Sequence, residues 1–184
     1  MTPKDIADRI FATFAARGGD TYGERITQLE HALQCAALAE AEGASDTMVA
    51  AALLHDFGHF FEGRGDAAEL EDRDAQHEAH GALMLKPWFG PQVAGPVALH
   101  VQAKRYLCAV EAGYEAALSP ASALSLRLQG GRFTPEEAQR FAAGRYAQDA
   151  IRLRRWDDAG KVEDVELEPL QAYRPLLETL AAKA

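Results

Sequence analysis

Apolar residues recur at the three- and four-residue spacing of amphipathic helices along most of the chain, with polar starts and glycine stops between them. Thr2 before Pro3 is typical of a helix start, and Thr27 and Thr134 each have glutamate three residues later, as in a capping box. We find no β-hairpin signal, internal repeat or linker. The pattern predicts helices over residues 3–17, 27–42, 46–55, 75–86, 91–110, 120–128, 135–143, 145–158 and 168–182.

Two of these boundaries depend on proline. Pro87 is expected to end the helix that begins near residue 75, and Gly95-Pro96 to break the helix over residues 91–110. At 184 residues the chain is long enough to bury a sizeable core without disulfide bonds or similar cross-links. We therefore expect one all-α domain of nine or ten helices over residues 1–184.

Composition and charge narrow the function. The net charge of −9 argues against a nucleic-acid partner, although an anionic small molecule needs only a local group of cations. No apolar stretch has the length of a membrane span, and the N-terminal residues lack the pattern of a signal peptide. Cys35 and Cys108 lack zinc-motif spacing and are expected to be reduced core thiols. We expect a cytoplasmic protein with no membrane partner; its oligomeric state is not predicted.

A His55-Asp56 pair closes the apolar run of residues 49–58, where an unpartnered carboxylate would be costly to bury. A bound cation is the simplest compensation. Other metal-ligand types recur along the chain: His31, His77, His100 and the pair Asp157-Asp158. Helices can direct such side chains inward, and four histidines with two carboxylates suit two metals such as iron or manganese. The alternative for each histidine is a core ring bonded to a carbonyl, and for the aspartates a solvated helix end.

The pattern His31…His55-Asp56…Asp157 resembles the HD-domain superfamily of metal-dependent phosphohydrolases. His77 and His100 resemble its di-iron subset, and within it the small oxygenases that cleave carbon–phosphorus bonds, relatives of myo-inositol oxygenase. The resemblance implies a mixed-valence Fe(II)/Fe(III) pair with O2 as co-substrate and Asp56 as the bridge. It implies six iron ligands, namely His31, His55, Asp56, His77, His100 and Asp157. Asp158 is a rival for the last ligand, and His80 is a rival for His77.

A phosphonate dianion needs cationic or hydrogen-bonding donors beside the metals. His59, Lys104 and Arg154 each stand about one helical turn from a predicted ligand, so they are candidate substrate-binding residues. Ser122 and Ser125 resemble family positions that bind phosphonate oxygens. The alternatives are a solvated Lys104 and two small packing serines.

Tyr22 and Glu24 precede the first ligand helix, where the resemblance implies residues that meet a substrate cation. Glu24 would pair with an ammonium, and Tyr22 could offer a cation–π face. We therefore expect 2-amino- or 2-trimethylammonio-1-hydroxyethylphosphonate as substrate, giving phosphate with glycine or glycine betaine. The alternatives are a hydrolase of phosphate esters or nucleotides with the same metal core, in which no O2 is consumed, and a non-catalytic metal-binding domain.

Overall fold

The computed structural model describes residues 1–21, 24–61 and 76–184, which form nine α-helices and three 3₁₀-helices, and this described part contains no β-strand. The α-helices are α1 (Pro3–Arg17), α2 (Gln28–Ala41), α3 (Asp46–Leu54), α5 (His77–Phe89), α6 (Pro91–Val110), α7 (Pro120–Leu128), α8 (Pro135–Ala142), α9 (Ala147–Ala159) and α10 (Arg174–Ala181). The 3₁₀-helices are η1 (Phe57–Phe61), η2 (Glu115–Ala117) and η3 (Leu170–Tyr173). The all-α prediction is confirmed.

Helix starts follow the local capping chemistry of the sequence. Thr2, Thr27 and Thr134 each accept a hydrogen bond from a backbone N–H three residues later, and the acidic side chain there bonds back to the cap. These reciprocal bonds satisfy N–H groups that the first helical turn leaves without partners. Caps of this kind explain why three helix starts were predictable within a residue.

Both proline predictions were wrong. Helix α5 continues through Pro87 to Phe89, and α6 runs unbroken through Pro96. Each proline removes one backbone hydrogen bond, but tertiary packing keeps the turn helical. Trp88 and Phe89 are buried just after Pro87, and the Pro96 ring is itself fully buried.

The C-terminal segment also differs from the predicted continuous helix over residues 168–182. It begins with the 3₁₀-helix η3, and the α-helix α10 starts only at Arg174. Pro175 has no N–H to donate to the carbonyl four residues earlier, so it stands in the first turn of a new helix. The first residue predicted for the α5 helix, Ala75, lies outside the described residues.

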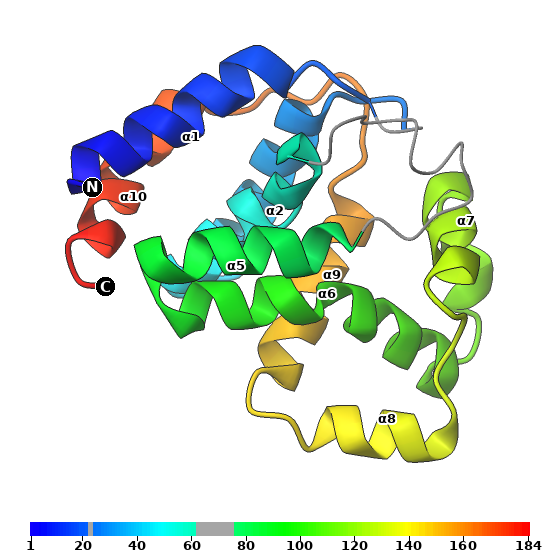
Figure 1. The fold of residues 1–184 in the computed structure, drawn as a ribbon. Coiled ribbons are helices and arrows are strands. Elements are labelled where there is room, and N and C mark those ends of the chain that lie inside the picture. Colours follow the sequence, from blue (N-terminus) through cyan, green and yellow to red (C-terminus); the bar gives the residue numbers. More distant parts are fainter. Residues whose placement is uncertain (22–23, 62–75) are drawn as a thin grey trace.

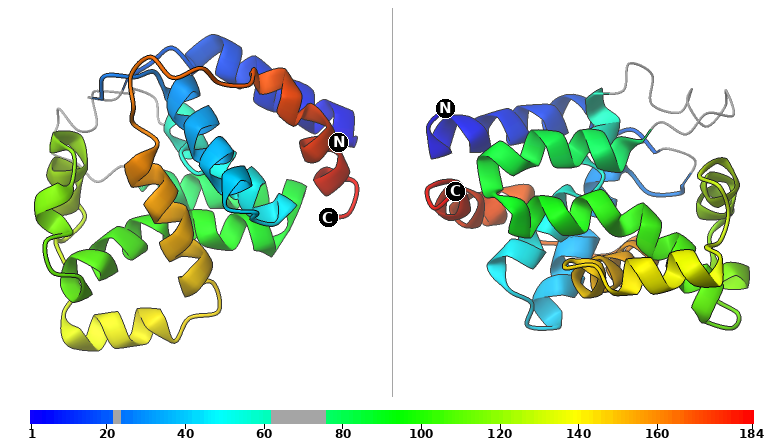
Figure 2. Two further views of the ribbon diagram at one scale, coloured as in Figure 1. Left: turned by 180° about the vertical axis from the view of Figure 1, so that it is seen from behind. Right: turned by 60° about the horizontal axis from the view of Figure 1, so that its bottom comes forward.

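Helices α5 and α6 pack side by side across the centre of the molecule, and α9 crosses behind α6 (Figure 1). Helices α2 and α3 pack together and against α9, while α1 lies along α10, which brings the two termini close together (Figure 2). The apolar faces of these helices form the main core. No helix in the described part is both long and apolar enough to cross a membrane.

The backbone of η1 approaches α5 very closely at two glycines. A Cβ atom on Gly58 would lie 1.9 Å from the His77 carbonyl oxygen and 2.8 Å from the Gly81 nitrogen. Gly81 is buried and in turn faces the Gly58 backbone. Only glycine permits this contact, which holds the segment after His55-Asp56 against the start of the helix that carries His77.

Candidate metal centre

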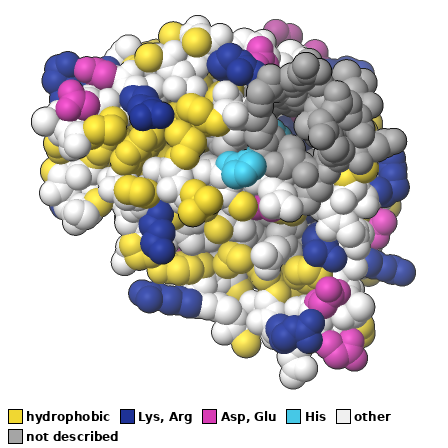
Figure 3. Space-filling view, viewed as in Figure 1, with side chains coloured by type: hydrophobic (Ala, Val, Ile, Leu, Met, Phe, Trp, Pro, Cys, Tyr) yellow, Lys and Arg dark blue, Asp and Glu magenta, His cyan; other side chains and the backbone are white. Residues whose placement is uncertain are grey.

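The six predicted ligands come from five separate parts of the fold. The contributing positions are His31 on α2, His55 and Asp56 just after α3, His77 at the start of α5, His100 in the middle of α6, and Asp157 near the end of α9. All are buried except Asp56, which is partly exposed. Among the described residues, histidine reaches the surface in one small area of the face shown in Figure 3.

Three of the histidines have their Nδ1 atoms within hydrogen-bond distance of backbone carbonyls. The pairs are His31 Nδ1 with Gly160 O at 2.9 Å, His55 Nδ1 with Ala52 O at 2.9 Å, and His100 Nδ1 with Val97 O at 2.7 Å. A carbonyl can only accept, so each ring carries its proton on Nδ1 when neutral. That tautomer leaves the Nε2 lone pair available for a metal, as in most histidine ligands.

The Nε2 atoms meet in pairs. His31 Nε2 lies 3.2 Å from His55 Nε2, and His77 Nε2 lies 3.1 Å from His100 Nε2. Two unprotonated nitrogens at this distance repel one another unless a proton or a cation lies between them. The donor set therefore fits two cations, one at each histidine pair.

Asp56 stands between the two histidine pairs. Its Oδ1 lies 3.4 Å from His77 Nε2, 3.6 Å from His100 Nε2 and 3.5 Å from His55 Nε2, and its Oδ2 lies 3.8 Å from His31 Nε2. Burial alone would raise the pKa of this carboxyl group, but the surrounding histidines, with His55 first, hold it well below its usual range. The anionic carboxylate can thus contact both cation positions.

Geometry separates Asp157 from its rival. Asp157 Oδ1 lies 3.5 Å from His31 Nε2 and Oδ2 4.0 Å from His55 Nε2. Asp158 instead accepts short hydrogen bonds from Tyr114 and Arg154, away from the histidines. Of the two neighbouring aspartates, only Asp157 faces the histidine group.

The structure also distinguishes His77 from His80. His77 is buried and its Nε2 faces His100 and Asp56, whereas the His80 side chain is exposed. The pair stand three residues apart on α5, so the sequence spacing could not separate them. The structure places His77, and not His80, among the candidate ligands.

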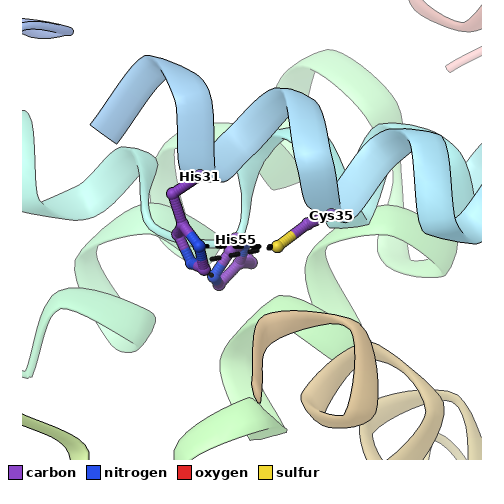
Figure 4. Close-up of side chains that lie close together, drawn as sticks. All are labelled: His31, Cys35 and His55. Atoms are coloured by element: carbon purple, nitrogen blue, oxygen red, sulfur yellow. Dashed lines mark hydrogen bonds between the residues drawn. The ribbon is translucent and has the colours of Figure 1, made fainter. Parts of the chain in front are cut away.

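Cys35 was missed as a neighbour of the site. Its Sγ lies 3.8 Å from the His31 ring nitrogens, and the candidate donor atoms of His31, Cys35 and His55 all lie within 4.8 Å of one another (Figure 4). The thiol also donates to the Trp156 carbonyl at 3.5 Å, and burial raises its pKa, so it is protonated. The expected free, buried thiol is confirmed, and the signal of its position was the four-residue spacing after His31.

A second group of polar side chains adjoins Asp157. We call Lys104, Arg154 and Lys161 the cation cluster. Lys104 Nζ donates to Ser125 Oγ at 2.7 Å, while Arg154 Nη2 and Lys161 Nζ donate to Ser122 Oγ at 3.3 and 3.0 Å. The structure thus brings four predicted substrate residues into one place and adds Lys161, which the sequence analysis missed.

Charges in the cation cluster are unevenly balanced. Arg154 donates to Asp157 at 2.6 Å and to Asp158, and these carboxylates raise its pKa although burial opposes them. Burial alone would raise the pKa of Asp157, but the Arg154 guanidinium outweighs this effect and the pKa lies well below its usual range. Lys104 has no carboxylate within ion-pair distance among the described residues. Burial, helped by Arg154, lowers its pKa to about 7.

The remaining predicted residues differ in placement. His59 stacks on His77 with ring centroids 3.8 Å apart, and burial lowers its pKa to about 3, so it is neutral. Glu24 accepts hydrogen bonds from Lys161 Nζ at 2.9 Å and from Ser119 Oγ at 2.7 Å. Tyr22 lies outside the described residues.

Comparison with known proteins places the chain in a family. The HD domain model matches residues 28–130. Hydroxymethylphosphonate dioxygenase of Gimesia maris is 43% identical over 179 residues, 97% of this chain and 89% of that protein. The glycine-betaine-forming [1-hydroxy-2-(trimethylamino)ethyl]phosphonate dioxygenase of Leisingera caerulea is 37% identical over 180 residues, 97% and 92% of the two chains. An uncharacterised protein of Acanthamoeba polyphaga mimivirus is 33% identical over 162 residues, 87% and 74% of the two chains. The chain therefore belongs to the HD-domain family, in the branch that contains these phosphonate dioxygenases.

Proposed function

We propose that this protein is a di-iron, O2-dependent oxygenase that cleaves the C–P bond of a 1-hydroxyphosphonate. The observation that carries the proposal is a buried group of cations and hydroxyls, made by Lys104, Arg154, Lys161 and two serines, directly beside a two-metal histidine–carboxylate site. Relatives that span nearly the whole chain act on phosphonates. A dianionic group adjacent to two metals is the ligand that this arrangement fits best.

The donor atoms divide naturally between two irons. His31, His55 and Asp157 would hold one, His77 and His100 would hold the other, and Asp56 would bridge them. Bound there, the iron pair would supply the oxidising chemistry with O2, which protein side chains cannot provide.

The chain's own residues would bind and orient the substrate. Lys104 and Arg154 supply positive charge, while Ser122 and Ser125 supply hydroxyls whose positions are set by those cations. All four are buried or partly buried, so charges there act at low dielectric and water is largely excluded. His59, neutral and packed on His77, can exchange hydrogen bonds with a phosphonate oxygen without adding charge.

Oxygenation of hydroxymethylphosphonate would balance as one O2 consumed for one phosphate, one formate and one proton. The substituted substrates would give glycine or glycine betaine in place of formate. The C–P bond breaks, carbon is oxidised and O2 is reduced, so oxygen uptake must match phosphate release.

The test is phosphate release measured together with O2 uptake, using iron-loaded protein with a determined iron content. The panel contains hydroxymethylphosphonate, both cationic 1-hydroxyethylphosphonates and several phosphate esters. We expect equal phosphate and O2 with at least one phosphonate and about two irons per chain. Phosphate from esters without O2 uptake, and none from phosphonates, would place the protein among the hydrolases instead.

A further inference from the structure

Lys161 stands just beyond the end of α9, four residues after Asp157. Its side chain is only 16% exposed, and its Nζ lies 2.9 Å from Glu24 Oε1, 3.0 Å from Ser122 Oγ and 3.6 Å from Asp157 Oδ1. One ammonium thus joins the segment before α2, the serine-bearing helix α7 and the metal site.

The Glu24 carboxylate already has a protein cation as its partner. Its carboxylate is 19% exposed and accepts from both Lys161 Nζ and Ser119 Oγ at its Oε1 atom. A carboxylate at this position would be suited to a substrate ammonium only if no protein cation were paired with it. Here the protein supplies that ammonium itself.

On the basis of the proposed function, we infer that Lys161 is a specificity-determining residue that selects against cationic substrates. Its ammonium takes the place at Glu24 that a 2-amino or 2-trimethylammonio group would need, so hydroxymethylphosphonate, which has no such group, is the preferred substrate. A second cation would have to approach Lys161 at close range in a largely buried site, and like charges in such a setting are strongly unfavourable. The same ammonium is close enough to Ser122 to add a third positive charge for the phosphonate.

Lys161→Met tests the inference because it keeps an unbranched side chain and removes the charge. The kcat/KM values for hydroxymethylphosphonate and 2-amino-1-hydroxyethylphosphonate give a preference ratio, and calorimetry on iron-loaded protein without O2 gives each Kd. We expect wild type to prefer hydroxymethylphosphonate by about 100-fold or more. The variant should shift the ratio by a similar factor toward the ammonium substrate, in both kcat/KM and Kd.

Two further variants and one control test the interpretation. Lys161→Gln keeps a hydrogen-bonding group for Glu24 and should move the ratio in the same direction, even where Lys161→Met folds poorly. Glu24→Gln combined with Lys161→Met should abolish the gain for the ammonium substrate, because the unpaired carboxylate is its cause. Glu163→Gln is the matched control: it removes the exposed Arg25–Glu163 ion pair between the same two segments and should leave the ratio unchanged.

The outcomes separate the two proposals. A wild-type protein that prefers the ammonium substrate, or a ratio unchanged in both Lys161 variants, overturns the inference while leaving the oxygenase intact. Absence of phosphate from every phosphonate overturns the oxygenase and the inference together.

Discussion

The histidine–aspartate group and the cation cluster lie side by side but are built in different ways. His55 and His100 are oriented by carbonyls three residues earlier in their own helices, so local helical geometry aims them. Lys104 and Lys161 are oriented by side chains from other segments, such as Ser125 and Glu24, and Arg154 is held both by Tyr114 and by two aspartates of its own helix. The metal site is therefore set mostly by helix packing, whereas the substrate site can change with one distant side chain.

The largest effect should come from the residue that joins the two histidine pairs. Asp56→Asn keeps the shape but removes the charge that both metal positions share. We expect iron content to fall below one per chain and kcat/KM for the phosphonate to fall by roughly 10³-fold, since metal-centred charge stabilisation is worth several kcal/mol. Iron analysis and phosphate release measure the two effects.

Asp46→Asn is the control for Asp56→Asn, because Asp46 is an exposed acid at the opposite end of the preceding helix α3. Its iron content and activity should match wild type. Two irons and full activity in the Asp56→Asn protein would disprove the bridging role.

Arg154 tests the cation cluster in the same manner. Arg154→Met leaves Asp157 and Asp158 without their shared guanidinium, and breaking a buried ion pair typically costs about 3–5 kcal/mol. Denaturant unfolding of the iron-loaded protein should show a loss of this size, together with a raised KM for phosphonate.

Arg155→Met is the matched control for Arg154→Met. Its guanidinium pairs with Glu111 on the surface, so the unfolding midpoint should not change. Equal stabilities of the two variants would mean that the buried network has no special role.

The sequence predicted features that depend on neighbouring residues better than contacts between residues far apart in the chain. Capping threonines, glycine stops and the His55-Asp56 pair act within one or two helical turns, so spacing indicated the helices and a group of candidate metal ligands. The choice of six residues that the structure brings together came from the resemblance to the HD-domain superfamily. Lys161, Tyr114 and Ser119 gain their partners from segments 40 to 137 positions away, and no local pattern marks such contacts. The predictions at Pro87 and Pro96 were wrong for a related reason, since packing against other parts of the chain outweighs one missing backbone hydrogen bond.

A substitution at Gly58 tests the two metal positions separately. Gly58→Ala would push η1 away from the start of α5, since its Cβ meets the His77 carbonyl. Overpacking of this kind costs about 1–3 kcal/mol, and the displacement should weaken the His77–His100 iron more than the His31–His55 iron.

Stepwise iron titration should show this as one weakened site in Gly58→Ala. Gly19→Ala is the control, because a Cβ there meets no atom within 4 Å. Two sites weakened equally would contradict the view that the glycine contact serves the second pair.

The smallest effect concerns the ionisation of Lys104. Its pKa of about 7 means that the ammonium is charged below this pH and neutral above it, whereas in the unfolded chain it would stay charged to about 10.5. Between these two values the unfolded state therefore binds more protons than the folded state. Lys104 consequently destabilises the folded protein less as the pH rises through this window, so the free energy of unfolding increases. Phosphonate binding needs the charged form, so kcat/KM should fall about tenfold for each pH unit above 7.

Lys104→Arg should remove that decline, because a guanidinium keeps its charge throughout this range. Ionisation of the substrate affects both proteins equally, so the difference between their pH profiles isolates Lys104. Parallel profiles in the two proteins would mean that Lys104 does not contact the phosphonate, and Lys104 would then be removed from the proposed substrate site.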